Sequence, residues 1–421
     1  MWGKKWKPVG KLAFSESDCL PPRNKVANKL DTECVSCSVC VEENKLCKCD
    51  GGDGSSTIIN DSVDVEQPVK ANSSFTHSVI NMIGMLIGLG QLSTPYALEN
   101  GGWVSVFLLV GLGIICSYSA HLLGKCLEKN PQLRSYTDIG HGAFGRKGKI
   151  LAAIFVYSEI FMALVSYTIS LHDNLNRVFT DTANIRLAGL SKSQLLTVIA
   201  ILVALPSLWL RDLSSISFLS TGGIFMSILI FVTVASTPIC GGVIADHSIP
   251  ILHLQKIPSI SGLYIFSYAG HIVFPNIYKA MKDPSMFTKV ATVSFTTVTA
   301  LYTALAFMGA RLYGPGVNSQ ITLSMPPHLI ATKIALWATV LTPMTKYALE
   351  FAPFAIQLEH NLPHLTSRMR MIVRDIVGSV LLLAILALAL SVPYFHHVLS
   401  LTGSLDACLA YLEPYHLYRH F

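Results

Sequence analysis

Long runs of apolar residues alternate with short polar segments over most of the chain. An α-helix needs roughly 20 residues to cross ~30 Å of hydrocarbon, and the runs approach or exceed that length. The convincing runs cover approximately residues 75–98, 103–124, 149–171, 194–210, 216–237, 258–279, 290–312, 328–350 and 375–393, and a weaker run covers 397–412. The pattern therefore predicts an all-α polytopic membrane protein with about ten spans.

Two of these runs contain helix-breaking residues at comparable points. The first run has Gly88, Gly90 and Pro95, and the sixth has Gly270 and Pro275. Non-helical backbone inside a bilayer must be buried in protein or line a wet cavity. One such segment alone is typical of ordinary packing and kinking in membrane helices. Two of them, five spans apart, indicate a solute site near the bilayer midplane and favour a secondary transporter.

Local geometry around the first break favours contact with a carboxylate. Pro95 is expected to begin the second half of the broken span, because proline needs no amide hydrogen bond at a helix start. The free N–H groups at such a start lie at the positive end of the helix dipole. Ser93 and Thr94 would add hydroxyl groups to the same site.

Composition and charge support the membrane assignment and restrict the partners. Of 421 residues, 51% are hydrophobic and only 13% are charged, which is typical of a chain whose solvent is the lipid bilayer. Basic residues gather in alternate loops, so the positive-inside rule predicts a cytosolic amino terminus, with the first span as the insertion signal. The net charge of +6 then reflects loop asymmetry, and no nucleic-acid partner is expected.

Residues 1–72 are polar and predict a disordered cytosolic tail ahead of a transporter domain at 73–421. The tail holds one cysteine cluster, formed by Cys34, Cys37, Cys40, Cys47 and Cys49. The cluster is interpreted either as a set of idle or acylated thiols or as a thiolate metal site, and the usual spacing of a four-ligand module is missing. No cofactor or enzymatic activity is predicted, because neither a nucleophile and base pair nor a complete metal site stands out.

Ionisable side chains inside the spans are candidates for coupling. Glu159, in the third span, would hold a proton or the substrate ammonium group, or would serve only as a structural partner. His271, beside the second break, would carry a proton or satisfy backbone carbonyls freed by the kink. Thr345 is a third candidate. Lys346 and Glu350 lie four residues apart on one helical face, which predicts a plain ion pair near the cytosolic end.

Several motifs resemble the amino acid/auxin permease family. They are Leu92–Ala97 (LSTPYA), Gly101–Trp103 (GGW), Tyr136–Gly140 (YTDIG), Phe266–His271 (FSYAGH), Phe274–Tyr278 (FPNIY), Met281–Pro284 (MKDP) and Thr345–Leu349 (TKYAL). The resemblance covers about 75–403. Within the family the chain is most similar to plant and fungal vacuolar amino acid transporters and to the vesicular inhibitory amino acid transporter.

This resemblance implies a LeuT-like fold with two five-span units of inverted topology and cation-coupled movement of amino acids. Spans one and six would be the equivalent broken members. The substrate carboxylate and amine would meet backbone groups at the two breaks, and the third span would bound the pocket. The implied backbone contacts are Gly88, Leu89, Gly90, Tyr268, Ala269 and Gly270.

Departures from the family pattern refine the prediction. Relatives often carry a cation-ligating asparagine where this chain has Gly84, which favours protons over sodium, and Gln91 adds an amide beside the expected pocket. We therefore expect a proton-coupled permease of neutral amino acids in the vacuolar or another endomembrane. The segment after Ser404 departs from an apolar tenth span and favours the alternative, a non-transporting amino acid sensor or scaffold.

Overall fold

The structure is a computed structural model that describes residues 72–133, 135–180, 191–204, 213–360, 366–392, 394–405 and 407. These residues all lie in the compact unit Gln67–Phe421. The predicted tail up to residue 71, with its cysteine cluster, lies outside the described residues. Within the described part the fold is all-α, and its one β-bridge joins Ser73 to Met281.

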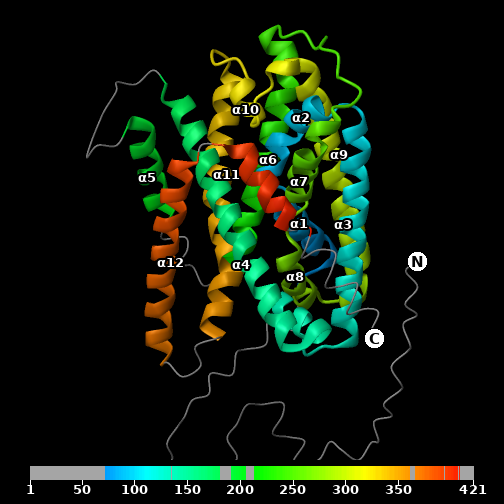
Figure 1. Ribbon diagram of the computed structural model, residues 1–421, viewed down its shortest axis with the longest axis vertical. Coiled ribbons are helices and arrows are strands. Elements are labelled where there is room, and N and C mark those ends of the chain that lie inside the picture. Colours follow the sequence, from blue (N-terminus) through cyan, green and yellow to red (C-terminus); the bar gives the residue numbers. More distant parts are fainter. Residues whose placement is uncertain are drawn as a thin grey trace, which may run out of the picture. The chain divides into compact units, whose positions relative to one another are not determined.

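The helices form a bundle in which two spans are each broken into a pair of short helices, α1 with α2 and α7 with α8 (Figure 1). In chain order the α-helices are α1 (Phe75–Leu86), α2 (Gly90–Gly101), α3 (Val104–Lys129), α4 (Tyr136–Val178), α5 (Lys192–Ala204), α6 (Leu213–Gly241), α7 (Ile257–Ser267), α8 (Phe274–Ala280), α9 (Phe287–Tyr313), α10 (Ile321–Ser324), α11 (Ile330–His360) and α12 (Ser367–Ser391). A further helical stretch covers 395–405. Short 3-10 turns are η3 (Leu254–Lys256), η4 (His271–Val273), η5 (Pro284–Met286) and η6 (Gly314–Gly316).

Both predicted breaks are present. α1 and α2 meet at an angle of 57° across Ile87–Leu89. In the second break α7 ends at Ser267, and α8 begins only after the turn η4. α2 packs against α7, and α1 packs against α8, so the two interruptions lie side by side in the interior. Lys282 N–H donates to the Ser73 carbonyl at 3.0 Å, which ties the start of α1 to the end of α8.

Pro95 does not begin the second half-helix, so that prediction was wrong. α2 already begins at Gly90, and Pro95 lies inside it. Proline cannot donate to the carbonyl four residues earlier. Thr94 Oγ1 instead donates to that carbonyl, on Gln91, at 2.9 Å. The local hydroxyl replaces the missing amide bond, and the helix continues through the proline.

By length and hydropathy, fewer helices qualify as membrane spans than the sequence predicted. Six helices among the described residues are long and apolar enough to cross a membrane, and the bent α1–α2 pair would make a seventh. α5 has 13 residues and falls short. α11 has 31 residues, ample for ~30 Å at 1.5 Å per residue, but it carries Lys333, Lys346 and Glu350. The predicted count of about ten stays unconfirmed.

α7 and the stretch 395–405 touch backbone to backbone at two glycines. A Cβ on Gly262 would collide with the Ser400 carbonyl, and one on Gly403 would collide with the Gly262 carbonyl. Small residues at such crossings let membrane helices approach closely. The final helical stretch is thereby held against the half-helix that leads into the second break.

We expect Gly403→Ala to lower the apparent melting temperature of the purified protein by several degrees. The added methyl group must push two backbones apart, and overpacking of this kind costs typically ~1–3 kcal/mol. Gly111→Ala is the matched control, because no atom lies within 4 Å of its added Cβ. Thermal unfolding followed by tryptophan fluorescence measures both. Equal melting of the two variants would contradict the tight crossing.

Candidate functional site

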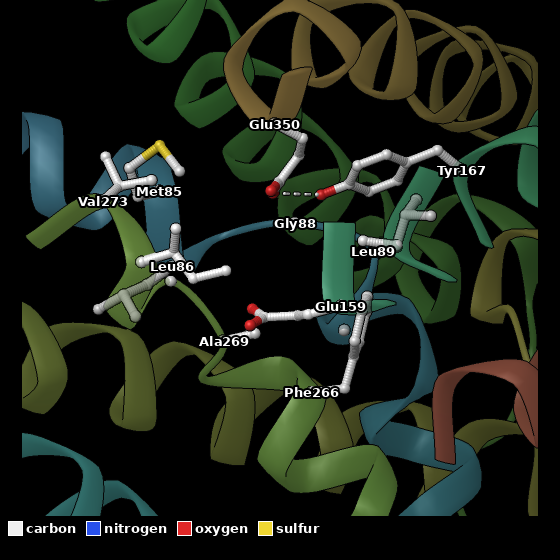
Figure 2. Close-up of a pocket in the computed structure, with 14 residues that line it drawn as sticks. Met85, Leu86, Gly88, Leu89, Glu159, Tyr167, Phe266, Ala269, Val273 and Glu350 are labelled. Atoms are coloured by element: carbon white, nitrogen blue, oxygen red, sulfur yellow. Dashed lines mark hydrogen bonds between the residues drawn. The ribbon is translucent and has the colours of Figure 1, made fainter. Parts of the chain in front are cut away.

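A small cavity lies between the two breaks (Figure 2). Its volume is about 30 Å³. One water needs roughly 10–15 Å³ by a comparable measure, so the cavity is smaller than an amino acid. It is lined by α1, α2, α4, α7, η4, α11 and the two breaks, through Met85, Leu86, Gly88, Leu89, Gly90, Glu159, Ala163, Tyr167, Phe266, Ala269, Gly270, Ile272, Val273 and Glu350.

Backbone from both breaks forms opposite sides of this cavity. Gly88, Leu89 and Gly90 contribute the first break and the start of α2, where Gln91 N–H donates to the Gly88 carbonyl at 3.3 Å and Leu92 N–H donates to the Leu89 carbonyl at 3.0 Å. Ala269 and Gly270 contribute the second break. Gly270 has φ 146°, a backbone conformation that residues with a Cβ rarely adopt. Peptide groups of both breaks thus add polar atoms to the wall.

Two carboxyl groups reach the cavity from different helices. Glu159 of α4 is buried, with 7% of its surface exposed, and Figure 2 shows its carboxyl group directed across the space toward Leu86 and Ala269. Glu350 of α11 points toward Tyr167, whose hydroxyl donates to Glu350 Oε1 at 3.1 Å. Acidic groups in a membrane interior normally face the bundle centre and mark a solute or proton path.

Lys346 does not form the plain ion pair with Glu350 that the sequence predicted. Its side chain is fully buried, and its ammonium group donates to the carbonyls of Gly84 at 2.5 Å and Met85 at 3.1 Å. The opposite charges of Lys346 and Glu350 still attract each other. Lys346 nevertheless donates its hydrogen bonds to α1, and Glu350 accepts its hydrogen bond from Tyr167 of α4. The spacing of four residues could not show this, because the partners come from other helices.

The hydroxyls of Ser93 and Thr94 are engaged away from the cavity. Thr94 bonds the Gln91 carbonyl, as described above, and Ser93 Oγ donates to the Ser319 carbonyl at 2.9 Å. The Thr94 bond lies within α2, and the Ser93 bond joins α2 to the segment before α10. The substrate contacts predicted for these two residues stay predictions.

Three other predicted residues also lie outside the cavity wall. The Tyr268 hydroxyl contacts the Leu109 carbonyl at 3.2 Å and Thr299 Oγ1 at 2.9 Å, so its ring faces α3 and α9. His271 Nε2 lies 3.3 Å from the Cys116 carbonyl, and its ring packs on Phe274. Thr345 Oγ1 donates to the carbonyl of Thr342 within its own helix. Their proposed roles in substrate binding and coupling are untested by this geometry.

Glu350 is the polar member of the wall that the sequence did not assign to it, whereas Tyr167 lies in the third span, which was expected to bound the pocket. Both were visible as polar residues within predicted spans, by the same signal that singled out Glu159. The apolar members, such as Met85 and Phe266, carry no distinguishing signal, because nearly every neighbouring residue is also apolar. Among the residues that the structure describes, no group of three or more His, Cys, Asp or Glu side chains could hold a metal ion.

A second, larger cavity of about 660 Å³ lies near the end of α4. It is mostly polar and is lined by Asp173, Asn176, Arg177, Thr180, Asn318, Ser319, Leu323, Tyr394, Phe395 and His396. A buried network holds α4 against the segment that leads into α10, since Gln320 Nε2 donates to Asp173 at 2.8 Å and Gln320 Oε1 accepts from Ser170 at 2.7 Å. The network fixes the end of α4 beside this larger cavity, since Asp173 also lines its wall.

Comparisons with solved structures agree with the fold. The chain is similar to MhsT in complex with L-phenylalanine, with a TM-score of 0.53, 12% identity, and coverage of 79% of this chain and 88% of that one. A Na+-coupled sialic acid symporter in a substrate-bound outward-open state gives 0.53 and 11%, with coverage of 82% and 80%. At such low identity these matches show the fold alone, and they confirm the predicted LeuT-like architecture.

Sequence comparison finds relatives with much higher identity to the chain. The chain is 61% identical over 378 residues to amino acid transporter AVT1H of Arabidopsis thaliana, covering 88% of this chain and 85% of the relative. It is 41% identical over 338 residues to amino acid transporter AVT1E of the same plant, covering 80% and 64%. The vesicular GABA transporter of Caenorhabditis elegans is 24% identical, with coverage of 80% and 71%.

The family comparison covers most of the chain. Residues 71–418 match the family described as transmembrane amino acid transporter protein. This match, with the relatives above, confirms the predicted resemblance and the expectation of a transporter rather than an enzyme. The chain belongs to the transmembrane amino acid transporter family.

Proposed function

We propose that the chain moves neutral amino acids across the vacuolar or another endomembrane, coupled to protons and by alternating access. The observation that carries this proposal is the cavity bounded by both helix breaks, which combines peptide groups of the two breaks with two carboxyl groups. Peptide N–H groups at the start of α2 suit a substrate carboxylate, and carbonyls or carboxylates suit its ammonium group. The relatives named as amino acid transporters support the same substrate class.

Neutral side chains fit the remaining wall. Leu86, Leu89, Phe266, Ile272 and Val273 contribute apolar surface, which favours an uncharged substrate side chain. Backbone groups from both breaks would hold the zwitterionic end, with Gly88, Leu89 and Gly90 on one side and Ala269 and Gly270 on the other.

The sizes of the two cavities support alternating access. The central cavity must widen before an amino acid enters, whereas the cavity at the end of α4 is already large. With a cytosolic amino terminus, α1 begins on the cytosolic side and this larger cavity opens on the other side. Rocking of one group of helices against the other would open the central site to each side in turn.

Purified full-length protein in liposomes with an imposed pH difference tests the proposal. Labelled neutral amino acid should accumulate against its gradient, and dissipation of the pH difference with a protonophore should abolish the accumulation. A pH difference of one unit is worth about 1.4 kcal/mol, which sustains about tenfold accumulation at one proton per solute. Binding without flux across an amino acid panel would reject transport and select the sensor alternative.

A further inference from the structure

Lys346 is the only fully buried lysine or arginine side chain among the largest buried residues of the described chain, and its environment is unusual. It lies on α11 with no exposed surface, and its ammonium group contacts the carbonyls of Gly84 and Met85 in α1. A charged group in a membrane interior is costly, so it persists where carbonyls or an opposite charge replace water. Here it has both, since Glu350 lies one turn along the same helix.

The carbonyls in question belong to the last turn of α1. The final four carbonyls of an α-helix have no partner within the helix, and the helix dipole adds negative character there. In α1 the Ile83 carbonyl accepts from Ile87 N–H at 2.8 Å, and the Leu86 carbonyl accepts from the Tyr302 hydroxyl at 2.9 Å. Lys346 occupies the remaining two, on Gly84 and Met85. All four carbonyls therefore have a donor, one from Ile87 in the break itself and the other three from side chains of α9 and α11.

Two glycines line the path of the lysine side chain. A Cβ on Gly223 of α6 would lie 3.9 Å from Lys346 Cε, and one on Gly88 of the first break would lie 4.0 Å away. The aliphatic part of Lys346 therefore passes between α6 and the first break at ordinary contact distance. The long, narrow side chain brings a single positive charge to the carbonyls and leaves little room for a second cation.

A cluster of backbone carbonyls at a helix C-terminus is the kind of site that binds a monovalent metal ion. We propose that Lys346 is a tethered cation that takes the place of such an ion at the α1 break, so that the protein holds its substrate-binding geometry without sodium, lithium or potassium. A metal ion and the ammonium group cannot bind the same carbonyls together, because two positive charges held so close to each other repel strongly. Gly84 contributes its carbonyl to Lys346 and has no side chain to ligate an ion.

The experiment compares the melting temperature of each variant in different salts. Purified full-length protein is melted in choline, sodium, lithium and potassium chloride at equal ionic strength. The wild type should melt at one temperature in all four salts. Lys346→Ala should melt several degrees lower in choline and regain part of the loss in one of the metal salts, because the vacated carbonyls then accept an ion. Lys346→Met should be destabilised without rescue, because its side chain refills the space and brings no charge.

The control is Lys333→Ala, which removes an exposed lysine from the same helix and should melt like the wild type in every salt. Ion-specific stabilisation of the wild type would overturn the proposal, and so would a Lys346→Ala variant as stable as the wild type in choline. If Lys346→Ala cannot be purified in choline, purification in the metal salts is the rescue test, and failure in all of them counts against the proposal.

A second experiment measures uptake, and only this experiment rests on the proposed transport function. In liposomes, wild-type uptake should be the same with internal and external choline as with sodium, whereas uptake by Lys346→Ala should require a metal cation. If no variant takes up any amino acid, the proposed function fails. The salt dependence of melting still decides whether Lys346 replaces an ion.

Discussion

Replacement of Glu159 by glutamine is expected to abolish accumulation of amino acid driven by a pH difference. Glu159 is the buried carboxyl group directed across the central cavity, and glutamine keeps its shape but cannot exchange a proton (Figure 2). If Glu159 carries the coupling proton, the accumulation ratio should fall from about tenfold to about one at one pH unit, because ~1.4 kcal/mol of driving force is lost. Uptake of labelled amino acid into liposomes measures the ratio.

Exchange measured in the same liposomes separates the two roles that the sequence left open for Glu159. Exchange of internal for external amino acid needs no net proton movement, so it should persist if Glu159 is only the proton carrier. If Glu159 instead binds the substrate ammonium group, Glu159→Gln should lose exchange as well. Glu128→Gln is the matched control, because Glu128 is exposed and pairs with Lys125 at 2.7 Å on the surface. Unchanged gradient-driven accumulation in Glu159→Gln would eliminate both roles.

The fold was predictable because its signals are local. Runs of apolar residues identify most spans, and Gly88, Gly90 and Gly270 mark the breaks since glycine is tolerated where a helix must stop. The pairing of the two breaks followed from their position five spans apart. Pro95 misled the prediction, because a hydroxyl on the preceding residue compensates for its missing amide and lets the helix continue.

The site was only partly predictable because its contacts join distant parts of the chain. Glycines of the breaks and Glu159 do line the cavity, as their positions in broken or apolar spans indicated. Sequence spacing paired Lys346 with Glu350. In the folded bundle Lys346 instead donates hydrogen bonds to α1, and Glu350 accepts one from Tyr167, 183 residues away in α4. Ser93 and Tyr268 looked equally suited to a solute, and their hydroxyls donate to the Ser319 and Leu109 carbonyls, outside the cavity wall. No periodicity distinguishes these uses.

In the proposed alternating access, contacts of α11 would link the two carboxyl groups of the central cavity to movement. Glu350 is joined to α4 through Tyr167, and Lys346 on the same helix is joined to α1. α11 therefore contacts both the broken helix and the helix that carries Glu159. A change in the charge of either carboxyl group acts on the contacts among α1, α4 and α11, and it shifts the balance between states only if those contacts differ between them.

Substitution of Gly90 by alanine is expected to reduce both stability and uptake. A Cβ on Gly90 would lie 2.5 Å from the Ser267 Cα, where the start of α2 meets the end of α7. No flexible side chain can move aside to relieve this contact, so the two half-helices must separate, at a typical cost of ~1–3 kcal/mol for overpacking. The apparent melting temperature should fall by several degrees, and uptake should fall by at least about tenfold if 1.4 kcal/mol of that strain reaches the transport cycle.

Gly88→Ala provides the contrast at the same break. Its added Cβ would meet the Tyr167 hydroxyl at 3.9 Å and Lys346 Cε at 4.0 Å, both ordinary contacts, so the melting temperature should stay close to that of the wild type. The methyl group nevertheless lies on the cavity wall and should weaken amino acid binding, measured by equilibrium binding of labelled substrate. Loss of stability in Gly88→Ala but not in Gly90→Ala would show that the breaks do not meet as described, because only the contact between α2 and α7 excludes a side chain at Gly90.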